Sequence, residues 1–402
     1  MPAATIAQNL RIQTNLWGRL ATTCVAHFTE HIYVGIIAVV LPVMSASLGL
    51  STAQAGFVVG IRSLVAGVSN IPSGLLADLN GRRSTLLGAC LVLLGLGSLL
   101  MSFSQGFGSL ILFIGVTAIG AGGFHPQSLS ILSARYPNHR ALALGVHDSS
   151  GNLGEILGPA TIGILLSVMD WRGTLQVWAI PGLVIGVVYA LFCTEIHKNT
   201  ISRRGLSRAL WRDIVTNRPV LVVFLVSVFR TMGQTALLPM LSFYLYQSLG
   251  FSSGTVGLYF STLLLFAAAA PSFSGWAADR LGRKPLLVWG LVVSAGAIAM
   301  LPVLPAGIPL AMGLGVAGIA LWALRPIIFA SAMEVAPPEI AGTLVGFLFT
   351  GNMGLSFISP ILAGIVADSY GMGAGLAFIG IFPLIGCVVA VVDYQSHEAT
   401  RA

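Results

Sequence analysis

Twelve strongly apolar runs follow one another along nearly the whole chain, and this feature constrains the fold more than any other. A hydrocarbon core about 30 Å thick needs about 20 apolar residues for each helical crossing. Only 8% of the 402 residues are charged, against about 25% in an ordinary soluble domain. The sequence therefore predicts an all-α membrane protein with twelve transmembrane helices. The runs are 18–45, 53–77, 84–103, 108–134, 141–168, 173–193, 218–246, 253–278, 285–304, 307–333, 341–366 and 373–393.

The basic residues predict the orientation of these helices. With a cytoplasmic N-terminus, sixteen of the twenty Lys and Arg residues fall in cytoplasmic segments and only Arg172 falls in an outside loop. Because cytoplasmic loops retain positive charge, both termini are expected on the cytoplasmic side of the plasma (inner) membrane. The basic residues are spread over many short loops, so the net charge of +7 reports topology and predicts no nucleic-acid partner.

The chain also repeats itself at an offset of about 200 residues, a period that indicates an internal duplication. Such a repeat implies two six-helix halves related by an axis along the membrane normal, with a cavity between them. We expect an N-terminal half at 1–193, a cytoplasmic linker at 194–217 and a C-terminal half at 218–402. Three matched pairs occur in the same order in both halves: 74–83 with 275–284, His125-Pro126 with Arg325-Pro326, and Gly151-Asn152 with Gly351-Asn352.

The first matched pair, G-x-x-x-D-x-x-G-R-R and its copy with Lys284 in the last place, resembles the signature loop of the major facilitator superfamily. The resemblance covers the whole chain and implies a transporter with a cytoplasmic gate. In this family the sixth position is usually basic, as at Arg280, whereas the first copy has Leu79. The aspartates and arginines could form charge-assisted hydrogen bonds in one conformation only. Alternatively, these charges only anchor the loops. The predicted gating residues are Gly74, Asp78, Gly81, Arg82, Arg83, Gly275, Asp279, Arg280, Gly282 and Arg283.

Two further stretches resemble drug exporters. Gly154-x-x-x-Gly158-Pro159 is similar to a motif of exporters and proton antiporters in the superfamily, although small residues at this spacing also serve helix packing alone. The stretch 123–127, together with Ala26-His27 and Gly151-Asn152, resembles the fosmidomycin-resistance branch. The substrate of that branch does not carry over, because other residues are expected at the positions of Glu30, His31, Arg62, Asp148 and Glu155.

Three arginines, Arg62, Arg230 and Arg325, lie inside the apolar runs. An ionisable side chain within a bilayer costs about 2.5–3.5 kcal/mol and usually faces a cavity or a partner. Together with His125, these residues are the predicted substrate site, because guanidinium groups suit carboxylate, phosphate or phosphonate. Alternatively, each arginine pairs with an internal acid and only holds helices together.

His27, Glu30 and His31 have the i, i+3, i+4 spacing that places side chains on one helical face. Such a face could relay protons, with Asp148, together with its neighbour His147, and Glu155 as second candidates for proton coupling. Structural hydrogen bonding is an alternative. A transition metal with His125 as a further ligand is another, but a lone helix face supplies too few ligands for a closed site, so we predict no metal and no cofactor.

Taken together, these features predict a monomeric secondary transporter that exports small anionic or amphipathic compounds by proton antiport with alternating access. A proton-coupled importer of organic anions and a non-transporting receptor on the same fold remain alternatives. No nucleophile, metalloprotease or nucleotide-loop motif occurs, so the chain is not expected to be an enzyme. Acidic residues near the ends of the runs, among them Asp368, are expected to be solvated.

Overall fold

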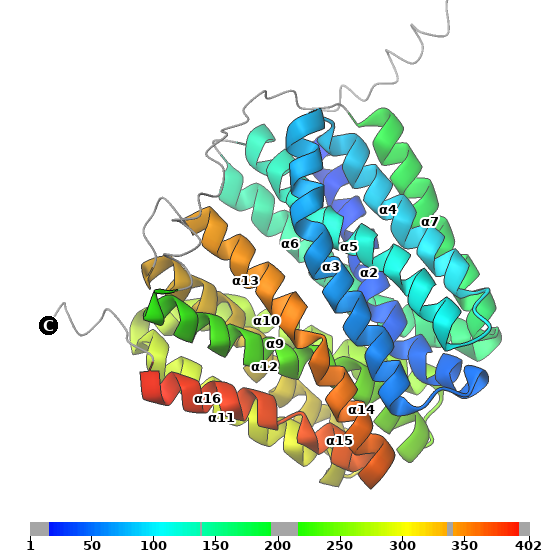
Figure 1. Cartoon of the computed structure of the whole chain (residues 1–402), viewed down its shortest axis with the longest axis vertical. Coiled ribbons are helices and arrows are strands. Elements are labelled where there is room, and N and C mark those ends of the chain that lie inside the picture. Colours follow the sequence, from blue (N-terminus) through cyan, green and yellow to red (C-terminus); the bar gives the residue numbers. More distant parts are fainter. Residues whose placement is uncertain (1–15, 137–138, 194–215, 336–340, 394–402) are drawn as a thin grey trace, which may run out of the picture. The chain divides into compact units, whose positions relative to one another are not determined.

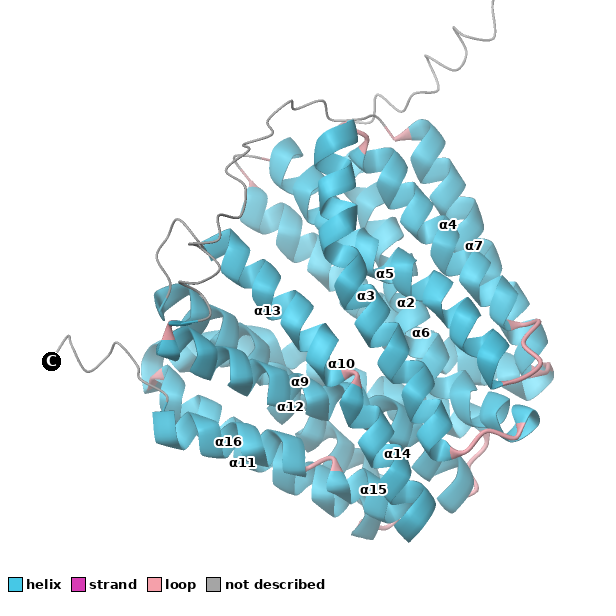
Figure 2. Ribbon diagram, viewed as in Figure 1, coloured by secondary structure: helices cyan, strands magenta, loops and turns pink. Residues whose placement is uncertain are grey.

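The computed structural model describes residues 16–136, 139–193, 216–335 and 341–393, and every element within these ranges is helical (Figures 1 and 2). Twelve of the described helical segments are long and apolar enough to cross a membrane. They follow the order of the apolar runs, so the predicted fold class and the twelve predicted spans are confirmed. The predicted linker at 194–217 lies almost entirely outside the described residues.

The first six spans are single helices, and several of the last six are interrupted. The first six are α2 (Leu16–Leu48), α3 (Thr52–Asn80), α4 (Arg83–Met101), α5 (Phe107–Arg135), α6 (Arg140–Val168) and α7 (Trp171–Phe192). The last six are formed by α9 (Arg218–Phe243) with η1 (Tyr244–Ser248), α10 (Ser253–Leu281), α11 (Arg283–Met300) with η2 (Leu301–Val303), α12 (Ile308–Val335), α13 (Ala341–Ser356) with α14 (Ile358–Tyr370), and α15 (Met372–Phe378) with α16 (Ile381–Asp393).

Packing divides the chain into two compact units. The first unit comprises residues 1–40 and 68–202, and the second comprises 41–67 and 203–402. The end of α2 and the start of α3 thus group with the C-terminal helices. Division into two six-helix halves, with boundaries at 193 and 218, stays a prediction.

Residues 41–67 are held in the second unit by glycine contacts and by one carboxylate. A Cβ at Gly56 or Gly60 would meet the carbonyl oxygens of Pro360 and Phe357, so only glycine allows α3 to approach α14 so closely. Each Asp368 oxygen accepts one backbone N–H of the first turn of α3, from Thr52 and Ala53, both at 2.9 Å.

Asp368 is exposed near the end of α14, as expected, and it also caps α3. The first four N–H groups of a helix have no partner within that helix, and a carboxylate fits them both as acceptor and as charge. Asp368 fills this role for α3 while its side chain stays exposed. The residues that it joins are 315 and 316 positions apart in the chain, so no local pattern could have indicated the contact.

Small residues also set the helix spacing in the first unit. A Cβ at Gly88 would meet the Gly186 carbonyl oxygen, and one at Gly95 would meet that of Ala179, which brings α4 against α7. Small residues of this kind let transmembrane helices approach closely where no hydrophobic effect drives their association.

Candidate functional site

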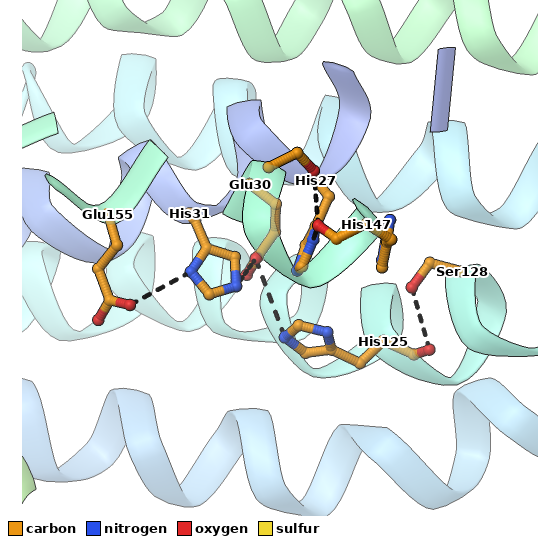
Figure 3. A network of polar contacts seen from close by, with 8 residues as sticks. His27, Glu30, His31, His125, Ser128, His147 and Glu155 are labelled. Atoms are coloured by element: carbon orange, nitrogen blue, oxygen red, sulfur yellow. Dashed lines mark hydrogen bonds and ion pairs between the residues drawn. The ribbon is translucent and has the colours of Figure 1, made fainter. Parts of the chain in front are cut away.

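Four titratable side chains converge in the first unit, three of them from α2 and one from α5 (Figure 3). Glu30 Oε2 lies 3.5 Å from His31 Nε2 and 3.9 Å from Nε2 of His125. His27 and His31 pack edge to face, with ring centroids 4.5 Å apart. The structure therefore brings the predicted helical face of α2 together and adds His125 to it.

A third helix, α6, completes this cluster with two residues. Glu155 Oε2 lies 3.6 Å from His31 Nδ1. The His147 carbonyl oxygen lies 2.7 Å from His27 Nδ1, and the two imidazole rings stack with centroids 3.8 Å apart. We call His27, Glu30, His31, His125, His147 and Glu155 the His/Glu cluster.

Burial differs across the His/Glu cluster. His27 and Glu30 are each only 3% exposed, and His147 is fully buried. The side chains of His31 and His125 are 19% and 38% exposed. Three charged or polar groups are therefore held deep in the helix packing, while His125 is the most exposed of the four converging side chains. Asp148, the other predicted coupling residue, lies on an exposed face of α6.

Glycines on α6 make this convergence possible. A Cβ at Gly151 would meet the His27 ring closer than 3.0 Å, and one at Gly154 would meet the Phe28 carbonyl oxygen. On the facing helix, a Cβ at Gly35 would meet the Pro159 ring. The Gly154-x-x-x-Gly158-Pro159 motif thus packs α6 onto α2 and brings Glu155 to His31. Its meaning for the direction of transport stays a prediction.

His147 was expected only beside Asp148, among the second candidates for proton coupling, and the sequence did not indicate its contact with His27. Its place depends on how closely α6 approaches α2, and that spacing is set by Gly151 and Gly154. The signal available in the sequence was the pair of small residues on α6, which indicated close packing but named no partner helix.

The three predicted arginines lie in the second unit and have different surroundings. Arg230 on α9 is 5% exposed, and its Nε donates to the Leu321 carbonyl oxygen of α12 at 2.8 Å. Arg325 on α12 is exposed, with its guanidinium carbon 5.8 Å from the centre of the Phe349 ring. Arg62 on α3 is half-buried. The Nε–H group of Arg230 therefore joins α9 to α12. Substrate contact by any of the three arginines stays a prediction.

The two signature loops show why two of their glycines are required. Gly81 has φ +63 and Gly282 has φ +83, a backbone region that favours glycine. At Gly74 and Gly275, by contrast, an added Cβ would meet nothing within 4 Å.

The charged residues of these loops are described only in part. The Arg280 guanidinium carbon lies 4.5 Å from the centre of the Trp276 ring, while Arg82 is exposed and Arg83 half-buried. Arg283 is half-buried at the start of α11. The side chains of Asp78 and Asp279 lie outside what the structure describes. The predicted gate is therefore not tested.

Comparison with known proteins shows that one protein-family model matches nearly the whole chain. The family model described as the Major Facilitator Superfamily matches residues 23–232 and 223–401. The chain is 22% identical over 404 residues to the Fosmidomycin resistance protein of Escherichia coli, which covers 99% of this chain and 98% of that protein. It is also 22% identical to the "Probable sulfoacetate transporter SauU" of Cupriavidus necator, over 88% of this chain and 87% of that protein.

The fold also matches solved structures. A bacterial homologue of the human lysosomal transporter Spinster, in an inward-facing and occupied conformation, superposes with a TM-score of 0.81. The two chains are 16% identical, and the match covers 95% of this chain and 97% of the other. At this identity the likeness concerns the fold alone.

Proposed function

Since this chain belongs to the Major Facilitator Superfamily, we propose that it exports small anionic or amphipathic compounds by proton antiport. Family membership confirms that the chain is a multi-pass membrane transporter and not an enzyme. Direction, coupling ion and substrate class are the proposed part.

The His/Glu cluster is the observation that carries proton coupling. An acid buried in a membrane protein usually belongs to an ion or proton pathway. Glu30 has two imidazoles within 4 Å, and His31 links it to Glu155. A proton can move between a carboxylate and an imidazole over such separations with small side-chain rotations or one bridging water. Asp148 would exchange protons with solvent from the exposed face of α6.

Arg62, Arg230 and Arg325 support an anionic substrate. A guanidinium group presents several donors that match the oxygens of a carboxylate, sulfonate or phosphonate. Arg325 is exposed and Arg62 is half-buried, so part of each side chain is accessible to a ligand. The name of the Cupriavidus relative, which refers to the anion sulfoacetate, agrees with this substrate class.

Transport would follow alternating access, as in other carriers built from two repeats. The chain would act as a monomer in the plasma membrane with both termini in the cytoplasm. The signature loops at 74–83 and 275–284 would close the cytoplasmic side, with Gly81 and Gly282 fixing the turn between adjacent helices.

Proton flux into liposomes tests the proposal. The purified protein is reconstituted with an internal pH dye, and a panel of anionic, cationic and neutral solutes is added on one side. Antiport of anions predicts that an anion gradient drives protons in the opposite direction, and that Arg325→Ala weakens the response. If cations alone drive protons, or labelled solute crosses without proton movement, the proposal is wrong.

The same experiment separates the alternatives. In an importer, protons and anions move in the same direction, so the dye response has the opposite sign. A receptor binds solute without flux.

A further inference from the structure

The His/Glu cluster has the composition and the geometry of a metal site. His27, Glu30, His31 and His125 each offer one ligand atom, and these four atoms all lie within 4.8 Å of one another. We propose that the cluster binds one divalent transition-metal ion of the zinc class. The sequence alone argued against a metal because one helix face has too few ligands. Here α5 contributes the missing ligand, His125 (Figure 3).

In His27 the second ring nitrogen is already hydrogen-bonded in the way that metal ligands require, and in His31 it lies close to a carboxylate. A histidine that binds a metal usually donates its other N–H to a carbonyl or a carboxylate. His27 Nδ1 faces the His147 carbonyl oxygen at 2.7 Å, and His31 Nδ1 faces the Glu155 carboxylate at 3.6 Å. The remaining ring nitrogen of His31, Nε2, lies 3.5 Å from Glu30 Oε2, and Nε2 of His27 is left as the atom that could bind an ion.

The buried Nε2 atom of His27 is the strongest single indication. This atom has no hydrogen-bond partner among the described residues, although His27 is only 3% exposed. A buried polar atom without a partner costs about 1–3 kcal/mol. A metal ion at the centre of the cluster would remove that cost by accepting its lone pair.

The spacing of the ligand atoms is close to that of a tetrahedral site. Bonds of about 2.0–2.1 Å place tetrahedral ligand atoms about 3.3 Å apart. The Nε2 atoms of His31 and His125 lie 3.5 and 3.9 Å from Glu30 Oε2. Side-chain rotations that move these atoms by about 1 Å or less would close the site. Three imidazoles with one carboxylate favour Zn²⁺, Co²⁺, Ni²⁺ or Cu²⁺ over Mg²⁺ or Ca²⁺.

Charge and access also fit. Glu30 and Glu155 together balance the charge of a divalent ion, and the partly exposed His125 provides an entry side.

Cobalt binding by the purified full-length protein in detergent micelles tests the site. Co²⁺ gives a visible absorption band whose intensity reports tetrahedral coordination, and any affinity tag that contains histidine is removed first. We expect one ion per chain, displaced by Zn²⁺ but not by Mg²⁺. His125→Ala and His31→Ala should weaken binding at least about tenfold, and Glu155→Gln about 10–100-fold, as for other outer partners of metal ligands.

His139→Ala is the matched control, because His139 precedes α6 and lies outside the cluster. It should bind Co²⁺ as the wild type does. His125→Ala is the safest ligand variant, since its side chain is the most exposed of the four, and an unchanged elution profile and unfolding temperature would show that it is folded.

Two results would overturn the metal site: no tetrahedral Co²⁺ band in the wild type, or equal affinity in wild type, His31→Ala and His125→Ala. Binding in micelles needs no gradient, so it is independent of transport. A protein that binds Co²⁺ but moves no protons would refute the proposed function and leave the metal site standing. A protein that moves protons but binds no Co²⁺ would refute the metal site and leave the proposed function standing.

Discussion

The two units contain the same packing arrangement with different chemistry. In the first unit, Gly151 of α6 lies against the ring of His27 on α2. In the second unit, the matching Gly351 of α13 lies against the ring of Phe224 on α9. Each unit thus places a glycine of the repeated Gly-Asn pair on an aromatic ring, that of α2 in the first unit and that of α9 in the second.

The residues that follow these rings show the difference. Three and four positions after His27 stand Glu30 and His31. At the same spacing after Phe224 stand Ser227 and Val228, and Asn352 Nδ2 donates to Ser227 Oγ at 2.8 Å. The titratable face of α2 therefore corresponds to an apolar and neutral face of α9.

The difference separates two roles that a coupled transporter needs. The packing arrangement alone requires no ionisable group, because the second unit forms it without one. Burying an acid and histidines in a membrane costs free energy. Packing therefore does not explain why the first unit contains them. In the repeated pair that ends in proline, the residue before the proline is His125 in the first unit and Arg325 in the second. At this position the second unit carries the permanently charged group. We infer that protons are handled by the first unit and the anion mainly by the second.

Glu30→Gln should have the largest effect, because it removes the titratable group at the centre of the His/Glu cluster. An amide cannot take up and release the proton as a carboxylate does, so we expect proton flux in liposomes to fall at least about tenfold, the equivalent of about 1.4 kcal/mol. Ser227→Ala at the corresponding position is the control and should leave proton flux unchanged. If Glu30→Gln moves protons at the wild-type rate, the two units do not differ in the way proposed.

Arg325→Ala tests the other side of the comparison. Because Arg325 is exposed, its loss should leave the amount of folded protein unchanged while lowering anion-driven flux about tenfold. Arg230→Ala should also lower the amount of folded protein, since it removes the bond to the Leu321 carbonyl oxygen. Protein levels and flux are measured in the same preparations. Full activity of both variants would remove the second unit from anion binding.

Sequence reasoning identified the twelve spans and the α2 face because both follow from local periodicity. The length of an apolar run predicts a transmembrane span. The 3.6-residue repeat of a helix places His27, Glu30 and His31 on one face. Contacts between helices could not be predicted in this way. The approach of His147 to His27 and the bond from Arg230 to Leu321 depend on how closely particular helices pack. Glycines indicate close packing, but a single sequence does not say which helix they face.

Substituting the matched glycines Gly151 and Gly351 one at a time tests whether the packing of each unit affects proton flux. In Gly151→Ala and Gly351→Ala, the new methyl group would overlap the His27 or the Phe224 ring, and overpacking of this kind costs about 1–3 kcal/mol. Both variants should unfold at a lower temperature in detergent, by about 2–4 °C per kcal/mol for units of this size. Only Gly151→Ala should also lower proton flux and Co²⁺ affinity, because it displaces His27. Equal loss of proton flux in both would mean that the second unit takes part in coupling.

Asn352→Ala should have the smallest effect and is the most specific test of the neutral site. The substitution removes a buried hydrogen bond to Ser227 Oγ, which contributes about 1 kcal/mol. Asn352 Oδ1 is buried without a hydrogen-bond partner among the described residues, so its removal offsets part of that cost. We expect a small decrease in unfolding temperature and unchanged proton flux. If the flux changes while the unfolding temperature does not, Asn352 acts in transport, and the neutral site of the second unit has a role beyond packing.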